Sequence, residues 1–281
     1  MAERPVVASK SLEGPPEPDP PLHPFAALMR RYSFAYTAAH DFAVCDQVMV
    51  DDYVLRMGEH VIRGRDSAYK PATARQYRQF PGLGFSVHEL VCNGERAALH
   101  FSEYGWSVLA RTHCSWRGVS LYRWDGHRLR ECRLEQDYYA RRRQLKTKVP
   151  DEVGAPGWDP WMTPINPPVQ ENEALVREWL HADGLSKSPD GALDDERWVG
   201  PCRARMALGH VDVPDLFSAG EKVVFQAVMR GRYAGGLTNL DAHIGAAAEI
   251  YATGIVTVRD GTVGDVRAIT DRLGLEKRLT A

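Results

Sequence analysis

Two stretches of the chain, VCNGERAALHFSEYG (91–105) and FSAGEKVVFQAVMRG (217–231), share one pattern. Each has a polar turn with a glycine and a glutamate, then a basic residue and an apolar run of strand length. Such turns between apolar runs are typical of β-hairpins. The turn glycines, Gly94 and Gly220, lie 126 residues apart. That period is too long for a solenoid repeat and suits a whole domain, so it predicts two copies of one fold.

The repeat continues toward the C-terminus of each copy. Residues 118–137 and 254–271 both start at a glycine, contain an Asp-Gly turn and end on an aspartate, Asp137 or Asp271. An arginine precedes each aspartate by four positions, as Arg133 or Arg267. We infer a tandem duplication.

Changes in composition divide the chain into four parts. Residues 1–24 are rich in proline and charge and predict a loosely docked arm. Residues 25–146 have a dense periodic pattern and form the first domain, and residues 171–281 form the second. Between them, residues 147–170 carry repeated prolines and two tryptophans, which indicates a linker.

Composition excludes several classes of protein. Of the 281 residues, 44% are hydrophobic and 26% charged, as in soluble globular proteins, and the net charge of −2 gives no reason to expect a nucleic-acid partner. The five cysteines are scattered without a close pair, which argues against a disulfide framework and a cysteine-rich zinc site. No signal peptide or membrane span is evident, so we expect a cytoplasmic protein without a membrane partner.

The first domain has helical patterns before its strands. Residues 24–40 have apolar positions at helical spacing, and a second helix follows Asp41, a good N-cap. After a short strand at 51–58, residues 64–80 are partly helical, with Pro71 interrupting or restarting the helix. Strand-like runs then continue to Asp137, joined by tight turns. This order predicts an α+β fold in which helices cover one face of a curved antiparallel sheet.

The segments AAHDFAVCDQVMVDDYVL, IRGRDS, FSVHELVCNGERAALHFSEYG and GVSLYRWDGHRLRECRLEQD carry a family resemblance. Together they resemble the SnoaL-like polyketide cyclases of the nuclear transport factor 2-like superfamily, over 25–145 and moderately over 205–281. The resemblance implies two tandem cone-shaped barrels, each closed by helices over an apolar pocket. Members of the superfamily include cyclases, ketosteroid isomerases, dehydratases, epoxide hydrolases and proteins that only bind ligands or partners.

The alternation of side chains along the strands, together with the resemblance, predicts which residues are catalytic. Alternate residues of a strand share a face, so one set holds Leu129, Glu131, Arg133, Glu135 and Asp137, and the other holds Arg130, Cys132, Leu134 and Gln136. The resemblance places the first set on the concave side, with Asp137 at the acid/base aspartate of the cyclases. Leu99, Phe101 and Glu103 of the preceding strand are also expected to point inward. The predicted catalytic residues are therefore Asp137, Glu135, Arg133 and Glu103.

Such a cluster suits proton transfer, because an apolar pocket raises the pKa of one carboxyl while an arginine keeps another ionised. The alternative is that Arg133 forms a structural ion pair with Glu135 or Glu131. The residues expected to bind substrate are Tyr53, Arg56, Phe101, Trp116 and Tyr32.

Several of these assignments leave alternatives open. Tyr53 and Arg56 are three apart, so a regular strand points only one of them inward. The same holds for His113 and Trp116. Instead of a role in the site, Tyr32 could belong to the core and His40 could cap a helix or lie on the surface. His100 is expected on the convex face or at an interface. No histidine and carboxylate set has metal-ligand spacing and no phosphate loop is present, so we expect neither metal nor cofactor.

The two copies differ in their proton carriers. The second half has Met229 and Ile269 at the positions of Glu103 and Glu135. We therefore expect an active first domain and a degenerate second domain that covers its sheet as an intramolecular pseudo-dimer, which favours a monomer.

The functional prediction is a cofactor-independent acid/base enzyme acting on an apolar small molecule such as a polyketide or terpenoid. Its reaction would be cyclisation, isomerisation, dehydration or epoxide opening. The alternative is a non-catalytic small-molecule-binding or scaffold protein of the same fold. An apolar cavity with buried carboxylates favours the enzyme, and a pocket filled by aromatic side chains favours the scaffold.

Overall fold

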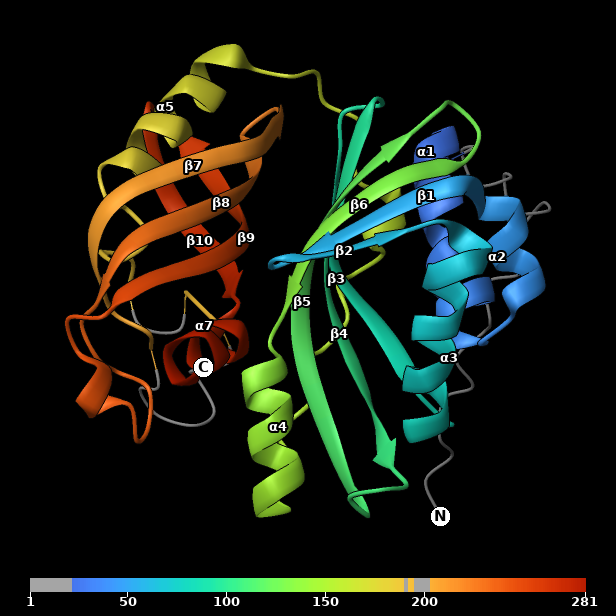
Figure 1. Ribbon diagram of the computed structural model, residues 1–281. Helices are drawn as coiled ribbons and strands as arrows, with labels where there is room; N and C mark the ends of the chain where they lie inside the picture. Colours follow the sequence, from blue (N-terminus) through green and yellow to red (C-terminus); the bar gives the residue numbers. More distant parts are fainter. Residues whose placement is uncertain (1–21, 190–191, 195–202) are drawn as a thin grey trace, which may run out of the picture.

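The computed structural model describes residues 22–189, 192–194 and 203–281. Two curved sheets stand face to face, with most of the helices on their outer sides (Figure 1). Most of the predicted N-terminal arm lies outside the described residues.

The first domain begins with helices and continues as a sheet. Asp41 caps the second helix as predicted, accepting a hydrogen bond from the Ala43 amide at 2.8 Å, and Pro71 lies in the first turn of a restarted helix. The elements are α1 (Pro24–Arg31), the π-helix η1 (Tyr32–Ala38), α2 (Phe42–Val48), β1 (Met49–Met57), β2 (His60–Arg63), the π-helix η2 (Arg65–Tyr69), α3 (Lys70–Gln79), β3 (Gly84–Cys92), β4 (Arg96–Ser107), β5 (Thr112–Trp124), β6 (Leu129–Gln136) and α4 (Tyr138–Thr147).

The first sheet has the order β2-β1-β6-β5-β4-β3. Its neighbours are antiparallel except for β1 and β6, which run parallel. The expectation of a purely antiparallel sheet is wrong at this pair, because β6, the last strand of this sheet, lies beside β1, the first, and runs in the same direction. The concave face packs against the helices around a core that includes Phe25, Met29, Tyr36, Leu99 and Phe101.

The linker and the second domain follow. They comprise the 3-10 helix η3 (Pro160–Met162), α5 (Gln170–His181), β7 (Met206–Ala219), β8 (Lys222–Tyr233), the 3-10 helix η4 (Asp241–His243), β9 (Ala247–Arg259), β10 (Thr262–Thr270) and α7 (Arg272–Thr280). Within the described residues the second sheet has the order β10-β9-β8-β7, and α5 packs on its outer face (Figure 1).

The two domains repeat the same local structures. Gly94 lies in the β3–β4 turn and Gly220 in the β7–β8 turn, both with the positive φ that glycine tolerates best. Asp137 caps α4 and Asp271 caps α7, each accepting a hydrogen bond from a backbone amide three residues on. The predicted tandem α+β fold is therefore confirmed.

The two sheets pack against each other through an apolar layer. Its buried residues come from β3, β4 and β5 on one side and β7, β8, β9 and β10 on the other, and are Val91, Ala98, Val119, Leu121, Phe217, Ala219, Val224, Ile255 and Ile269.

Equivalent positions of the two domains meet across this contact. The Thr253 hydroxyl donates to the Val119 carbonyl at 2.8 Å, and Arg142 pairs with Glu276. The residues of each pair lie 134 positions apart, the same spacing as the helix caps Asp137 and Asp271, so matching positions of the two copies meet as at the axis of a twofold dimer. The chain therefore contains a pseudo-dimer.

Candidate active site

A cavity of about 200 Å³ lies inside the first cone, between its helices and the concave face of its sheet. Aliphatic and tyrosine side chains make up most of its wall, and Glu103 supplies the carboxyl of this lining. The lining residues are Tyr32, Thr37, Leu55, Met57, Ile62, Tyr69, Ala72, Thr73, Gln76, Tyr77, Glu103, Leu134, Gln136 and Tyr138.

Glu103 projects into the cavity from β4, as predicted, and is only 6% exposed. The Gln76 side chain of α3 donates to its Oε2 at 2.7 Å. Burial raises the pKa of Glu103 to about 7, while hydrogen bonds and the nearby charge of Arg141 act in the opposite direction. Both protonation states are therefore populated near neutral pH, which suits a group that donates and accepts protons.

A second polar group lies where β6 passes into α4. The Trp116 indole donates to Gln136 Oε1 at 3.2 Å, and the guanidinium of Arg141 lies 3.9 Å from the ring centre of Tyr138. Burial raises the pKa of Tyr138 to about 12, so its hydroxyl stays protonated at neutral pH. Sequence reasoning missed Gln76, Gln136 and Tyr138, although Gln136 belongs to the alternate set of β6 residues that the resemblance placed outside.

The predicted face of β6 is wrong. The register pairs Gln136 with Gly118 and Glu135 with Val119, and Val119 belongs to the apolar layer between the domains. Directly paired residues share a face, so Glu135 points toward the second domain, as do Arg133 and Glu131 of the same parity. The alternation holds from Glu131 to Gln136, but a register shift before Glu131 puts Leu129 in the core of the first domain together with Cys132 and Leu134.

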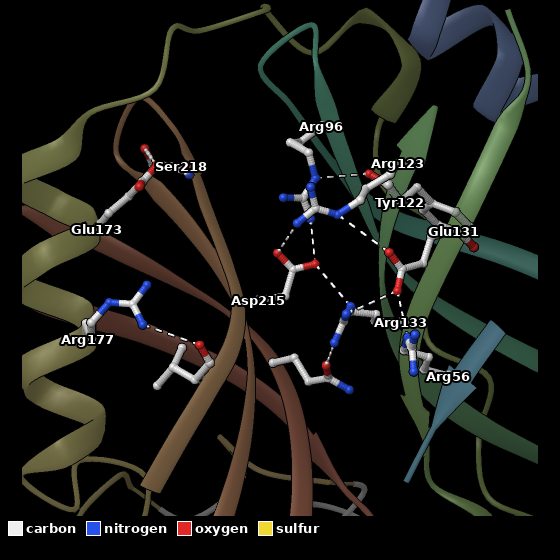
Figure 2. Close-up of polar contacts among 12 residues, drawn as sticks. Arg56, Arg96, Tyr122, Arg123, Glu131, Arg133, Glu173, Arg177, Asp215 and Ser218 are labelled. Atoms are coloured by element: carbon white, nitrogen blue, oxygen red, sulfur yellow. Dashed lines mark hydrogen bonds and ion pairs between the residues drawn. The ribbon is translucent and has the colours of Figure 1, made fainter. Parts of the chain in front are cut away.

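Arg133 lies in a charged cluster between the domains (Figure 2). Its guanidinium donates to Gln226 of β8 at 2.9 Å and lies 3.1 Å from Glu131 and 3.5 Å from Asp215. Arg96 and Arg123 also pair with Asp215, at 2.7 and 3.0 Å. The ion-pair alternative therefore describes Arg133, with Glu131 rather than Glu135 as its partner.

Arg56 also lies outside the pocket and pairs with Glu131 at 2.8 Å. It lines an open groove of about 500 Å³ with Arg96, Arg123 and Arg130. That groove is larger than the cavity in the cone, but Glu131 and Asp215 engage three of its four arginines. We therefore take the cavity around Glu103 as the candidate active site.

The remaining two predicted catalytic residues connect the domains. Glu135 accepts a hydrogen bond from the Gly58 amide at 2.8 Å, and its own amide donates to Thr253 Oγ1 at 3.0 Å. Burial, followed by the charge of Asp271, raises the pKa of Glu135 well above its ordinary value. Asp137 is fully buried and lies 2.5 Å from Arg272 of the second domain. Neither lines the cavity, so the predicted four-residue cluster is not assembled there.

Of the predicted substrate-binding residues, Tyr32 lines the cavity. Tyr53 and Phe101 are buried in the surrounding core, where they pack against Tyr69 and Phe85. Trp116 is buried as well and reaches the wall through Gln136.

The histidines lie away from the cavity lining. His40 stacks on Tyr77 with ring centres 3.8 Å apart, and His113 lies against Trp106 near an exposed hairpin. His100 lies between the domains beside Arg267, as the interface alternative predicted. Among the described residues, no group of three or more His, Cys, Asp or Glu side chains is arranged to hold a metal ion.

The position of Glu103 is apolar in the second domain. Met229 of β8 is buried there in a core with Phe225, Tyr233 and Leu237, and Trp179 of α5 packs on this core. These side chains offer no carboxyl at the position that corresponds to Glu103.

No helix of the described chain is long and apolar enough to span a membrane.

Sequence comparison supports the family resemblance for the first domain. Residues 29–132 match the family model of the SnoaL-like domain. Residues 29–132 are therefore similar to the SnoaL-like domain, and the pocket that they help to build supports a small-molecule-binding or cyclase-type function. Among curated proteins, no significant sequence match was found.

Solved structures show distant similarity over about half of the chain. A protein assigned as a SnoaL-like polyketide cyclase from Jannaschia sp. CCS1 is 13% identical, with 47% of this chain and 99% of that chain covered and a TM-score of 0.41. AclR from Streptomyces galilaeus, assigned as a hydroxylase, is 17% identical, with 44% and 85% covered and a TM-score of 0.40. At this distance neither activity nor substrate is transferred.

Proposed function

We propose that the chain is a cofactor-independent acid/base enzyme for a compact, mostly apolar small molecule, with Glu103 as its proton carrier. The observation that carries this proposal is the buried Glu103 carboxyl in the cavity of the first cone, with a pKa of about 7. Gln76 donates a hydrogen bond to Oε2 of Glu103 and so fixes the position of this oxygen. Cyclisation, isomerisation, dehydration and epoxide opening all use such a proton transfer.

The size and lining of the pocket favour a second candidate, a non-catalytic binding protein. Four tyrosines occupy much of the wall, and about 200 Å³ is below the ~300–1,000 Å³ of typical ligand pockets. A compact ring system fits this space better than a long multi-ring molecule. The two candidates differ in whether Glu103 transfers protons.

The test uses 5-nitrobenzisoxazole, a flat apolar compound that reports on a base. The base removes its ring C–H proton, and the electron pair opens the N–O bond to give a cyanophenolate. We expect the rate to rise with pH through a midpoint near the pKa of Glu103, about 7. Positioned proton transfer contributes ~10²–10⁴-fold, so Glu103→Gln should lose about that factor.

Glu135→Gln is the matched control, because Glu135 is also a buried carboxyl but lies outside the pocket. It should keep the acceleration of the wild-type protein. Wild-type and Glu103→Gln proteins with equal rates, together with a bound probe, would favour the non-catalytic candidate. Loss of activity in Glu135→Gln alone would contradict the assignment of Glu103.

A further inference from the structure

Four consecutive residues at the start of α4 alternate between the pocket and the second domain. Gln136 and Tyr138 line the cavity. Asp137, between them, lies 2.5 Å from Arg272, and Tyr139 packs in the core of the second domain. The segment 136–139 is therefore a wall of the pocket on one side and a domain contact on the other.

Arg272 is the centre of that domain contact. It is the first residue of α7 and is 1% exposed, and its guanidinium lies 3.4 Å from Asp194 and 5.0 Å from the ring centre of Tyr139. Asp137 also caps α4 by accepting from the Ala140 amide at 2.9 Å. A buried ion pair has one low-energy geometry, because moving either partner leaves a charge without compensation in the interior.

We propose that Arg272 of the second domain is a positioning residue for the pocket of the first. By holding Asp137 and Tyr139 it fixes the start of α4, and thereby places Gln136 and Tyr138 against Trp116 and Glu103. This inference rests on the proposed function for the role of Glu103, but the position of the wall itself does not depend on it. The second domain then contributes to the site of the first domain, although it has Met229 at the position that corresponds to Glu103.

A neighbouring ion pair provides a matched control. Arg142 of α4 pairs with Glu276 of α7, so it joins the same two helices about one turn further on. Its side chain is 30% exposed and contacts Glu276 and the ring of Tyr139. Arg142→Met should therefore weaken the domain contact without releasing the cap of α4.

The first readout is hydrogen exchange of the Trp116 indole N–H, observed by NMR in the full chain. This N–H donates to Gln136, so its protection reports directly on the wall. Arg272→Met should raise its exchange rate about tenfold or more, Arg272→Lys should restore part of the protection, and Arg142→Met should leave it near the wild-type rate.

The second readout is titration of Glu103 by NMR of labelled glutamate carboxyls, with Glu103→Gln used for assignment. A loosened wall admits water, which reduces the effect of burial. In Arg272→Met the midpoint should fall by about one pH unit, a tenfold change in the protonation equilibrium. In Arg142→Met it should stay at the wild-type value.

Wild-type protection of the indole N–H in folded Arg272→Met protein would overturn the proposal, as would equal effects of Arg272→Met and Arg142→Met. If Arg272→Met fails to fold, Asp137→Asn provides the test, since asparagine still caps α4 while the ion pair is lost. A wild-type midpoint of Glu103 near 4.5 would contradict the proposed function, whereas the indole exchange would still decide the role of Arg272.

Discussion

Replacing Glu103 with glutamine should make the protein more stable at alkaline pH while removing its proposed activity. Glutamine has nearly the shape of a protonated glutamic acid, and its carbonyl can still accept the hydrogen bond from Gln76. The substitution therefore removes the ionisation of a buried carboxyl and little else. Functional groups held in unfavourable surroundings commonly show this opposition between stability and activity.

The size of the effect follows from the shift in pKa. Burial raises the pKa of Glu103 from 4.5 to about 7. Between these values the folded protein holds a proton that the unfolded chain has released, so the free energy of unfolding falls as pH rises. At ~1.4 kcal/mol per pH unit, the loss is about 3 kcal/mol and is complete above pH 7. Below pH 4.5 both states are protonated and the contribution disappears.

Denaturant unfolding of both proteins at several values between pH 5 and pH 8 measures this difference. The stability of Glu103→Gln relative to the wild-type protein should grow by about 2.5 kcal/mol across that range, because part of the loss occurs below pH 5. Other titrating groups, including Glu135 and Asp194, contribute equally to both proteins and cancel in the difference. Glu95→Gln, at an exposed turn, should show no such trend. A difference independent of pH would refute the reasoning.

Two further predictions concern the contact between the domains. Thr253→Val removes the hydroxyl that donates to the Val119 carbonyl and accepts from the Glu135 amide, so unfolding should become easier by about 1–3 kcal/mol, measured by denaturant titration; Thr280→Val, which changes an exposed hydroxyl, should change stability little. Because the fused second domain already covers the first sheet, light scattering should give a mass near the 31.5 kDa of one chain, and a mass of twice that value would contradict the monomer prediction.

Local sequence patterns were sufficient for the repeat and for many of its elements. The turns at Gly94 and Gly220, the cap at Asp41 and the inward position of Glu103 depend on neighbouring residues or on alternation within one strand. Turn residues and helix caps act over a few positions, so one chain segment contains most of the information they need.

The residues that surround Glu103 could not be predicted from local sequence patterns. Gln76 comes from α3 and Gln136 from the end of β6, so their meeting depends on how the helices close over the sheet. Asp137 and Arg272 are likewise 135 residues apart and meet only because the second domain packs against the first. Neither the repeat period nor the spacing of residues along the chain indicates such contacts.

The sequence by itself determined that β6 has two alternating faces, and only the tertiary structure decided which one is concave. In a sheet with one face in water, the apolar set marks the inside. Here the second sheet covers the outer face, so Val119 and Leu121 of β5 are as apolar and as buried as residues inside the cone. Burial on both sides removes the contrast between the faces of β5. On β6 the apolar Cys132 and Leu134 lie in the core of the first domain, and the charged Arg133 of the other set lies opposite because the second domain supplies Gln226 and Asp215 as its partners.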